Sequence, residues 1–422
     1  MRVPGVHIRQ SVFIILCCLG AFSSLWGTDK VHITVEAGLY DRIDCVVAAD
    51  ISSVDQLDKR PRVSLYETVG EERREVACQL LEGKDGKPYL YWVLTGKTPA
   101  GTMREFVVEP ITGNSEVAVM KIEDTGKALV LKKNESEILQ YNYAVTNPPS
   151  GVDTVYQRSG FIHPVYAPSG NILTTIQPKD HYHHFGVWNP WTRVEYEGNV
   201  YDLWNLGDKQ GTVRARNVEK TFQGSVCVGY SANLDHYIFS ASGEKIVMNE
   251  SWTVKSWNIP ERFLWDFEST LQDVTSLPIN IKAYRYGGFV WRGTQEWTKD
   301  NCIMLTSEGK SRSEIDGTTA RWIYVTGTCG GDKQSGFLLL GHPDNYNAPE
   351  PLRIWDEKAN DGRGDVFVNF APTKYKDWQL MPGKDYSLRY RICTYDGEMT
   401  VAEANRLWND YAYPPRVIVR KQ

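Results

Sequence analysis

Short segments in which apolar and polar residues alternate one by one constrain the fold of this chain more than any other feature. VHITVE at 31–36 is the first, and RVSLYE at 62–67, PYLYWVL at 88–94 and REFVVEP at 104–110 follow it. A period of two places the apolar side chains on one face of a strand, so the pattern is typical of half-buried strands. Turn-forming stretches such as GKDGKP and KTPAGT separate these runs. The spacing predicts an N-terminal β-sandwich module.

The same alternation continues through the rest of the chain and predicts a second, larger β-sandwich. Long examples are VCVGYSANLDHYIF at 226–239 and EKIVMNESWTV at 244–254, and ARWIYVTGT follows at 320–328. DYSLRYRICTY at 385–395 places four side chains on one face, those of Tyr386, Leu388, Tyr390 and Ile392.

A single helix is expected near the C-terminus, because Thr400 and Glu403 have the spacing of a capping box. Apolar residues then recur at helical spacing, at Val401, Ala404, Leu407 (with Trp408) and Tyr411. The predicted fold class is all-β, with a smaller sandwich module at 28–115, a large antiparallel β-sandwich at 116–415 and this one helix.

The N-terminal residues predict export. Basic residues precede the apolar run SVFIILCCLGAF, and cleavage after residue 23 would leave Ala21 and Ser23 at the two positions that a signal peptidase reads. We therefore assign 1–23 to a signal peptide and expect the periplasm or cell surface of a Gram-negative bacterium. A lipid anchor at Cys17 or Cys18 is the alternative. No later segment has the ~18 consecutive apolar residues of a membrane-spanning helix.

Charge and composition exclude some classes of partner. The net charge is -5, and Lys and Arg are scattered rather than clustered, which argues against a nucleic-acid partner. Aromatic residues make up 12% of the chain, and such residues suit both half-buried strands and surfaces that stack on sugars. No CxxC pair is present, so a thiolate zinc site is not supported.

The segment at 160–191, GFIHPVYAPSGNILTTIQPKDHYHHFGVWNPW, is the strongest candidate for a functional site. It holds four of the eight histidines of the chain. Proline and glycine at this density fix a loop, and imidazoles in a fixed loop suit proton transfer or metal binding. The candidate acid–base residues are His163, Tyr166, His183, His184 and His342.

A metal site is the alternative use of the same histidines. In an extended segment His181 and His183 would point to one face and could present two nitrogens to one divalent metal ion, with His163 or His342 as a third ligand. Acid–base catalysis without a metal fits the residues equally well. Both interpretations remain open.

Two further stretches carry residues suited to binding a substrate: AYRYGGFVWRG at 283–293 and GHPDNYNAPEPLRIW at 341–355. An arginine such as Arg292 can hold a carboxylate in a bidentate fork. Together with the tryptophans of the histidine segment, the candidate substrate-binding residues are Trp188, Trp191, Tyr286, Arg292, Asn345, Arg353 and Trp355.

The pieces GFIHPVYAPSG, DHYHHFGVW, YRYGGFVWR and GHPDNYNAPEPLRIW resemble a bacterial family often labelled PmoA-like, after a methane oxygenase subunit. The resemblance covers roughly 125–415, with one departure: the family carries an arginine where this chain has Phe185. It implies an exported protein of carbohydrate-degrading systems with a mutarotase-like sandwich, a fold used by glycan lyases, hydrolases and epimerases. The oxygenase label itself does not fit, because that subunit is built of membrane-spanning helices.

These observations lead to three hypotheses. The first is an exported carbohydrate-active enzyme that cleaves a plant, algal or host glycan by β-elimination or hydrolysis. In a lyase, His183 or His184 would remove the proton beside a uronate carboxyl, a tyrosine would protonate the leaving oxygen, and Arg292 or Arg353 would neutralise the carboxylate. The alternatives are a non-catalytic glycan-binding surface protein, with tryptophans that stack on sugar rings, and a metal-dependent enzyme with a His181–His183 site.

Overall fold

The computed structural model describes residues 31–54, 63–110, 119–331 and 333–421. The predicted signal peptide at 1–23 lies outside these residues.

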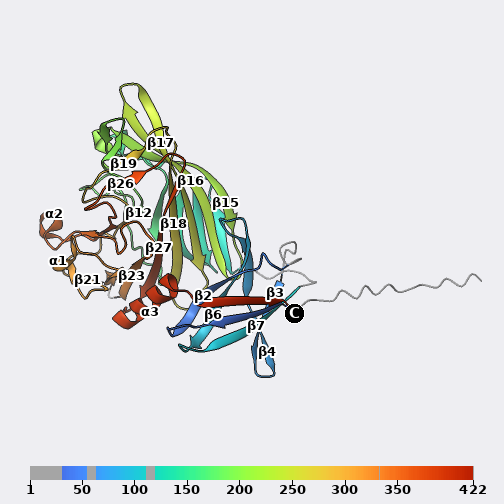
Figure 1. The fold of residues 1–422 in the computed structure, drawn as a ribbon. Coiled ribbons are helices and arrows are strands. Elements are labelled where there is room, and N and C mark those ends of the chain that lie inside the picture. The colour runs from blue at the N-terminus through green and yellow to red at the C-terminus, as the bar shows by residue number, and fades with distance from the viewer. Residues whose placement is uncertain (1–30, 55–62, 111–118, 332, 422) are drawn as a thin grey trace, which may run out of the picture.

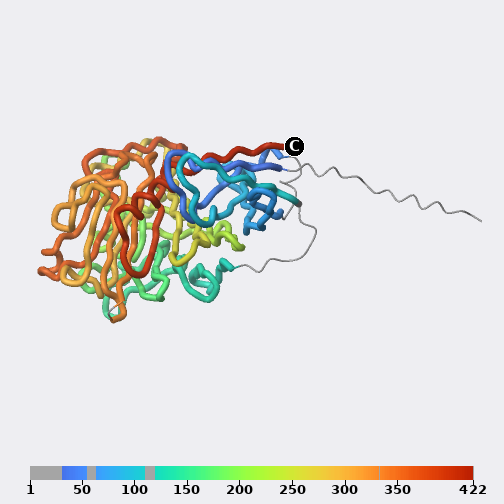
Figure 2. Tube along the Cα trace, turned by 90° about the horizontal axis from the view of Figure 1, so that it is seen from below, coloured from blue at the N-terminus to red at the C-terminus, as the bar shows by residue number. Residues whose placement is uncertain are grey.

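The N-terminal part forms a small sandwich of two sheets (Figure 1). The first sheet has the order β28-β1-β7-β3-β4, and its strands are β28 (Arg416–Lys421), β1 (Val31–Glu36), β7 (Met103–Pro110), β3 (Val63–Val69) and β4 (Glu72–Val76). The second contains β2 (Arg42–Asp50), β6 (Pro88–Thr98) and β5 (Cys78–Glu82). Alternate residues such as Ile33, Trp92 and Phe106 fill the space between them. The last strand, β28, lies beside the first, as both views show (Figures 1 and 2).

The larger part of the molecule is built on an eight-stranded antiparallel sheet. Its strands, in spatial order, are β15 (Gly211–Phe222), β16 (Cys227–Ser240), β17 (Gly243–Trp257), β18 (Phe263–Asp273), β27 (Asp385–Asp396), β23 (Lys333–Gly341), β22 (Trp322–Cys329) and β21 (Cys302–Thr306). Leu388, Tyr390 and Ile392 of β27 are fully buried on its inner face, which confirms the predicted alternation. On the opposite face, β15 to β18 carry polar side chains.

A second eight-stranded sheet packs against that inner face. Its order is β24 (Leu352–Ile354), β25 (Phe367–Phe370), β20 (Phe289–Arg292), β12 (Val187–Trp188), β11 (Phe161–Val165), β10 (Ser136–Asn142), β9 (Ala128–Lys133) and β8 (Met120–Asp124). Val187 and Trp291 pair across β12 and β20 and enter the main core, so Trp188 and Arg292 point to the outer face. A four-stranded sheet of β14 (Asn199–Tyr201), β13 (Val194–Tyr196), β19 (Ile279–Ile281) and β26 (Trp378–Leu380) adds to the same core.

The predicted C-terminal helix is present as α3 (Val401–Ala412). The Thr400 side chain accepts a hydrogen bond from the Glu403 N–H at 3.2 Å. The second half of the capping box is replaced, because the Glu403 carboxylate pairs with Arg406 and Arg262 instead. Ala404, Leu407 and Trp408 pack on the large sheet and the N-terminal module, whereas Val401 is 45% exposed. The other helices within the described residues are the single turns α1 (Arg312–Ile315) and α2 (Ala359–Gly362), with 3-10 turns η1 (Thr154–Tyr156) and η2 (Leu206–Asp208).

The predicted all-β class is thus confirmed: two antiparallel sandwiches of unequal size and one long C-terminal helix. The segment 277–291 is divided between β19 and β20, because Gly287 and Gly288 adopt φ angles of 151° and 89° that interrupt a regular strand. None of the helices in the described part of the chain has the length and apolar content needed to traverse a bilayer.

Candidate active site

The predicted histidine segment covers the outer face of the second sheet. Between β11 and β12 the chain forms a closed loop at 177–185, called here the histidine loop. Its ends are joined by the Gln177 N–H to the His184 carbonyl at 2.8 Å and by a bridge between Ile176 and Phe185. Phe185 and Trp188 anchor it in a small aromatic cluster on this face.

The histidine loop is not an extended strand. His181 N–H donates to Pro178 O at 2.9 Å and His184 N–H to His181 O at 3.1 Å, so two turns follow one another. The expected alternation of faces is therefore wrong here. The turns gather the three rings instead, with centroids 5.5 Å apart for His181 and His183 and 4.7 Å for each of these with His184.

Gly186 allows this loop to lie close to β11. Its φ of 59° is in the left-handed region, and a Cβ there would lie 2.5 Å from the Ile162 carbonyl oxygen. Any other residue would push the histidine loop away from the sheet.

Asp180 is the centre of the hydrogen bonds at this site. One oxygen, Oδ2, accepts from His181 Nδ1 at 2.7 Å, from Arg292 Nη2 at 3.0 Å and from Asn360 Nδ2 at 2.8 Å. Burial raises the pKa of Asp180, but the His181 hydrogen bond, the Arg292 charge and the Asn360 hydrogen bond outweigh it and hold the pKa well below its ordinary value. Asp180 is therefore a carboxylate at neutral pH, which fixes Nδ1 of His181 as the donor.

Arg292 forms the ion pair with the Asp180 carboxylate from the buried side of the site. Its side chain is 2% exposed, and Nη2 also donates to Asp365 at 2.9 Å. The guanidinium lies 4.6 Å from the ring centroid of Trp355. Burial lowers the pKa of Arg292 to about 10, so the group is a cation at neutral pH. Among the described residues, no partner accepts from Nε or Nη1.

The three histidines of the loop differ in access to solvent. The His181 side chain is 30% exposed and His183 is half-buried, whereas His184 is 2% exposed between Trp188 and Phe367. Burial lowers the pKa of His183 to about 4 and that of His184 well below its ordinary value. Both rings are neutral at neutral pH, and only His181 and His183 can meet a substrate without movement of the loop.

Arg292 was expected to hold a substrate carboxylate, but it is buried and held by Asp180 and Asp365 instead. Three more of the predicted substrate-binding residues lie close to this loop. Tyr286 Oη accepts from Arg353 Nη2 at 3.0 Å and from Trp355 Nε1 at 3.3 Å, and the Trp355 ring lies 4.8 Å from His181. Trp188 lies beneath them, fully buried, so it is packed in the protein rather than open to a sugar.

Other candidates from the sequence lie apart from this loop. His163 and Tyr166 are on and just after β11, where His163 Nδ1 meets Thr174 Oγ1 at 2.9 Å; burial lowers the pKa of His163 to about 4 and raises that of Tyr166 to about 12. Trp191 is in the main core against Trp378. His342 packs edge-on against Tyr411 of α3.

Asn345 is also structural in its contacts. Its amide donates to Glu350 Oε2 at 3.0 Å and to the Arg389 carbonyl at 2.9 Å, and the side chain is buried. These five candidates, which the sequence pattern assigned to one functional site, therefore lie outside the histidine loop in the fold.

The alternative of one divalent metal ion, with His181 and His183 as ligands, does not fit the donors at this site. Across the described ranges, no three His, Cys, Asp or Glu side chains are arranged to hold a metal ion. His181 and His183 meet ring edge to face, and Nδ1 of His181 is used by Asp180.

Two residues of the site, Asn360 and Asp365, were not among those expected from the sequence; both lie in the loop KANDGRGD at 358–365. Asn360 donates to both Asp180 and Asp365, and Arg363 pairs with Asp365. Asn360 and Asp361 have φ angles of 51° and 54°, a conformation that asparagine and aspartate tolerate better than most residues. The sequence feature that could have indicated this loop is the presence of two glycines beside two aspartates within KANDGRGD.

Comparisons with known proteins concern the family and the general fold. The model of the family described as "Family of unknown function (DUF6807)" matches residues 128–409, which include the histidine loop. No curated protein matches the chain.

Among solved structures, an α-mannosidase from Enterococcus faecalis V583 is similar with a TM-score of 0.44 and 8% identity, over 93% of this chain and 46% of that one. A glycosyl hydrolase family 38 protein from Enterococcus faecalis gives 0.43 and 8%, over 93% and 47%. A galactose mutarotase-related enzyme from Lactobacillus acidophilus gives 0.33 and 8%, over 65% and 97%. The chain spans about half the length of the two Enterococcus proteins.

Proposed function

The chain belongs to the family of unknown function DUF6807, and from the geometry of the histidine loop we propose that it is a carbohydrate-active enzyme that uses acid–base catalysis. The hydrogen bond of 2.7 Å between Asp180 Oδ2 and His181 Nδ1 carries this proposal. A carboxylate at one nitrogen of an imidazole orients the ring and stabilises the imidazolium that forms when the other nitrogen takes a proton.

His181 is the proton acceptor in this proposal. Its Nδ1 is held by Asp180 and its side chain is 30% exposed, so Nε2 is the nitrogen available to a substrate. Arg292 keeps Asp180 ionised and has no room to exchange partners, because its side chain is almost fully buried. His183, neutral and half-buried, lies beside the acceptor with ring centroids 5.5 Å apart, and Tyr182, the residue between them in the chain, packs against Tyr156.

A β-elimination fits these groups better than hydrolysis. His181 Nε2 takes the proton from the carbon beside a uronate carboxyl, a carbon–carbon double bond forms, and the glycosidic carbon–oxygen bond breaks. The leaving oxygen takes a proton from Tyr182 or from solvent. A glycosidase needs one protonated carboxyl acid facing a second carboxylate. Asp180 is held ionised, and Asp365 does not donate a proton because Arg292 and Arg363 bind its carboxylate.

A sugar is the proposed substrate because planar rings surround the acceptor. Trp355 is 7% exposed and packs against His181, so it supports that ring rather than facing a sugar. Tyr286, whose hydroxyl accepts from Trp355, is the partly exposed ring of the pair. Aromatic faces with a polar edge suit the apolar faces and hydroxyl groups of pyranose rings.

The test is turnover of acidic polysaccharides, followed by the absorbance of the unsaturated product. His181→Ala is expected to lower kcat by at least about 100-fold, the usual contribution of a positioned base, while the protein stays folded. Asp180→Asn should lower it less, since the ring remains but its tautomer is no longer fixed. His342→Ala, which removes a histidine outside the site, is the matched control and should keep the wild-type rate. A wild-type rate in His181→Ala would remove this residue from the mechanism.

Export is part of the same proposal. N-terminal sequencing of the protein recovered from its native host should give a mature chain that begins after Ser23. A mature chain that retains the first residues would contradict export by the predicted signal.

A further inference from the structure

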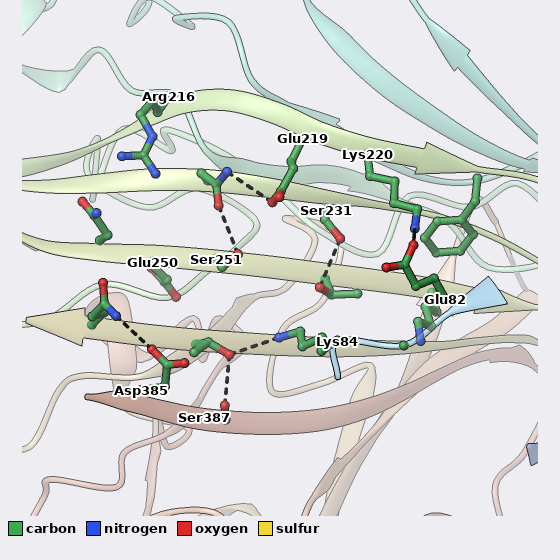
Figure 3. Close-up of a pocket in the computed structure, with 18 of the residues that line it drawn as sticks. Glu82, Lys84, Arg216, Glu219, Lys220, Ser231, Glu250, Ser251, Asp385 and Ser387 are labelled. Atoms are coloured by element: carbon green, nitrogen blue, oxygen red, sulfur yellow. Dashed lines mark hydrogen bonds and ion pairs between the residues drawn. The ribbon is translucent and has the colours of Figure 1, made fainter. Parts of the chain in front are cut away.

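A second feature lies on the other side of the molecule, on the outer face of the large sheet. A cleft of about 780 Å³ is enclosed there by β15, β16, β17, β18 and β27 on one side and by Glu82, Gly83 and Lys84 of the N-terminal module on the other (Figure 3). A volume of this size is typical of sites for small-molecule ligands. The histidine loop covers the second sheet, so the cleft is separate from the proposed catalytic site.

The floor of the cleft contains a straight row of neutral polar side chains, called here the polar row. Asn233, Ser251, Thr270 and Ser387 are direct cross-strand neighbours on β16, β17, β18 and β27. Neighbouring strands are about 4.8 Å apart, so the row presents hydroxyl and amide groups at regular intervals over about 14 Å. Asn249 and Gln272, which also pair, extend the pattern to the next row.

Three of the four residues in the row, all but Thr270, are not of a type that favours a strand. Asparagine and serine are weak strand formers, and the central strands of a large sheet usually carry threonine, valine or aromatic residues at such positions. The side chains also bond to one another: Ser251 Oγ donates to Asn233 Oδ1 at 3.1 Å, and Thr270 and Ser387 share a hydrogen bond of 2.9 Å. The row is thus pre-ordered and offers both donors and acceptors.

The charged residues around the row are largely neutralised in pairs. Lys84 Nζ lies 3.1 Å from Glu268, Lys220 Nζ lies 3.6 Å from Glu82, and Arg216 Nη1 lies 3.1 Å from Asp235. A cleft for a polyanion would hold a set of cations without carboxylate partners. This lining suits a ligand that is rich in hydroxyl groups and carries little charge.

We propose that this cleft binds a neutral oligosaccharide, with the sugar hydroxyls bonded to the polar row. The N-terminal module forms one wall of the site, and Lys84 joins that wall to the row through a hydrogen bond to Thr270 Oγ1 at 3.1 Å. The proposal does not depend on catalysis at the histidine loop.

Isothermal titration calorimetry on the full chain tests this proposal, with tetrasaccharides of β-1,4-linked glucose, mannose and xylose as neutral probes and trigalacturonate as the acidic one. Saturable binding of at least one neutral probe is expected. Ser251→Val/Thr270→Val removes two hydroxyls and leaves a β-branched residue, which suits a strand, at both positions, so the fold should persist while the dissociation constant rises at least about tenfold. Ser251→Trp, which fills the cleft, should abolish binding.

The matched control is Ser64→Val/Thr68→Val, which makes the same exchange on β3 outside the cleft and should bind as the wild type does. His181→Ala should also bind normally, so loss of turnover and loss of binding are separable. The proposal is overturned if no neutral probe binds, if only trigalacturonate binds, or if binding survives in both cleft variants.

Discussion

At the scale of single residues, Arg292 is the group on which the proposed catalytic site depends. It is almost fully buried, its Nη2 serves both Asp180 and Asp365, and its plane covers Trp355. Removing one partner of a buried charged pair leaves the other without a counter-charge, and this costs more than the pair contributed.

Arg292→Met is therefore expected to destabilise the protein by about 3 kcal/mol and to raise the pKa of Asp180. Urea unfolding measures the first effect, and the pH dependence of turnover measures the second. Arg292→Lys, the conservative control, keeps a charge and should lose less stability. Equal stability of wild type and Arg292→Met would show that the carboxylates do not need the arginine.

A second buried pair lies within the main core. His236 Nε2 and Glu250 Oε2 are 2.8 Å apart with both side chains fully buried, and Ser269 and Asn189 donate to the other carboxylate oxygen. Burial raises the pKa of Glu250, but the His236 hydrogen bond and charge and the other two donors lower it below its ordinary value.

Glu250→Leu should cost about 3 to 5 kcal/mol of unfolding free energy, because His236 and two donors lose their acceptor. The double variant His236→Leu/Glu250→Leu should recover part of that loss, since it leaves fewer unpaired polar groups. A double-mutant cycle in urea gives both values. Additive effects of the two substitutions would mean that the pair is not coupled.

At the scale of elements, the histidine loop depends on one glycine. Gly186→Ala would combine a strained positive φ with a Cβ 2.5 Å from the Ile162 carbonyl oxygen. The expected result is a loss of about 2 kcal/mol or more, together with a loss of turnover as the loop moves away from β11. Gly170→Ala is the matched control: its φ is 88°, but no atom lies within 4 Å of the added Cβ. Gly170→Ala should lose only the stability that the positive φ costs, and turnover should be retained.

Elements differ in how well the sequence predicts them. Strand β1 follows from alternation of apolar and polar residues, and Leu388, Tyr390 and Ile392 of β27 share a buried face as expected, although Arg391 and Cys393 on its other face are buried too. The capping pattern of Thr400 and Glu403 likewise predicted α3, although Glu403 took other partners. In these cases the information is local.

The sites depend on information that is not local. Asp180 and Asn360 meet across 180 residues, and no spacing in the chain indicates it. The segment DHYHH has no helical or strand period, so only the turns seen in the structure reveal which rings approach. The polar row was missed for the same reason, because four strands contribute one residue each.

At the scale of the whole molecule, buried histidines make stability depend on pH. Burial lowers the pKa of His163, His183 and His342 to about 4 and that of His184 well below its ordinary value. Between about pH 6.5 and 4 the unfolded chain therefore binds protons that the native protein does not. The stability that these neutral rings provide is complete above pH 6.5 and decreases as the pH falls.

The free energy of unfolding is expected to fall by up to about 1.4 kcal/mol per pH unit for each of these histidines. Urea titrations at several values between pH 7.5 and 4.5 measure the slope. His342→Gln removes one titrating ring away from the catalytic site and should make the slope shallower. A flat profile over this range would mean that the rings are accessible to protons in the native state.

The pairing of β28 with β1 joins strands separated by some 380 positions in the chain. Contacts of such separation form late, since the cost of closing the intervening loop must be met first. During synthesis from the N-terminus, β1 leaves the ribosome early. The edge of β1 that pairs with β28 stays unpaired until β28 has been synthesised. The first sheet to be translated is thus among the last to be completed, and its exposed edge is the place where nascent chains are most prone to pair with one another.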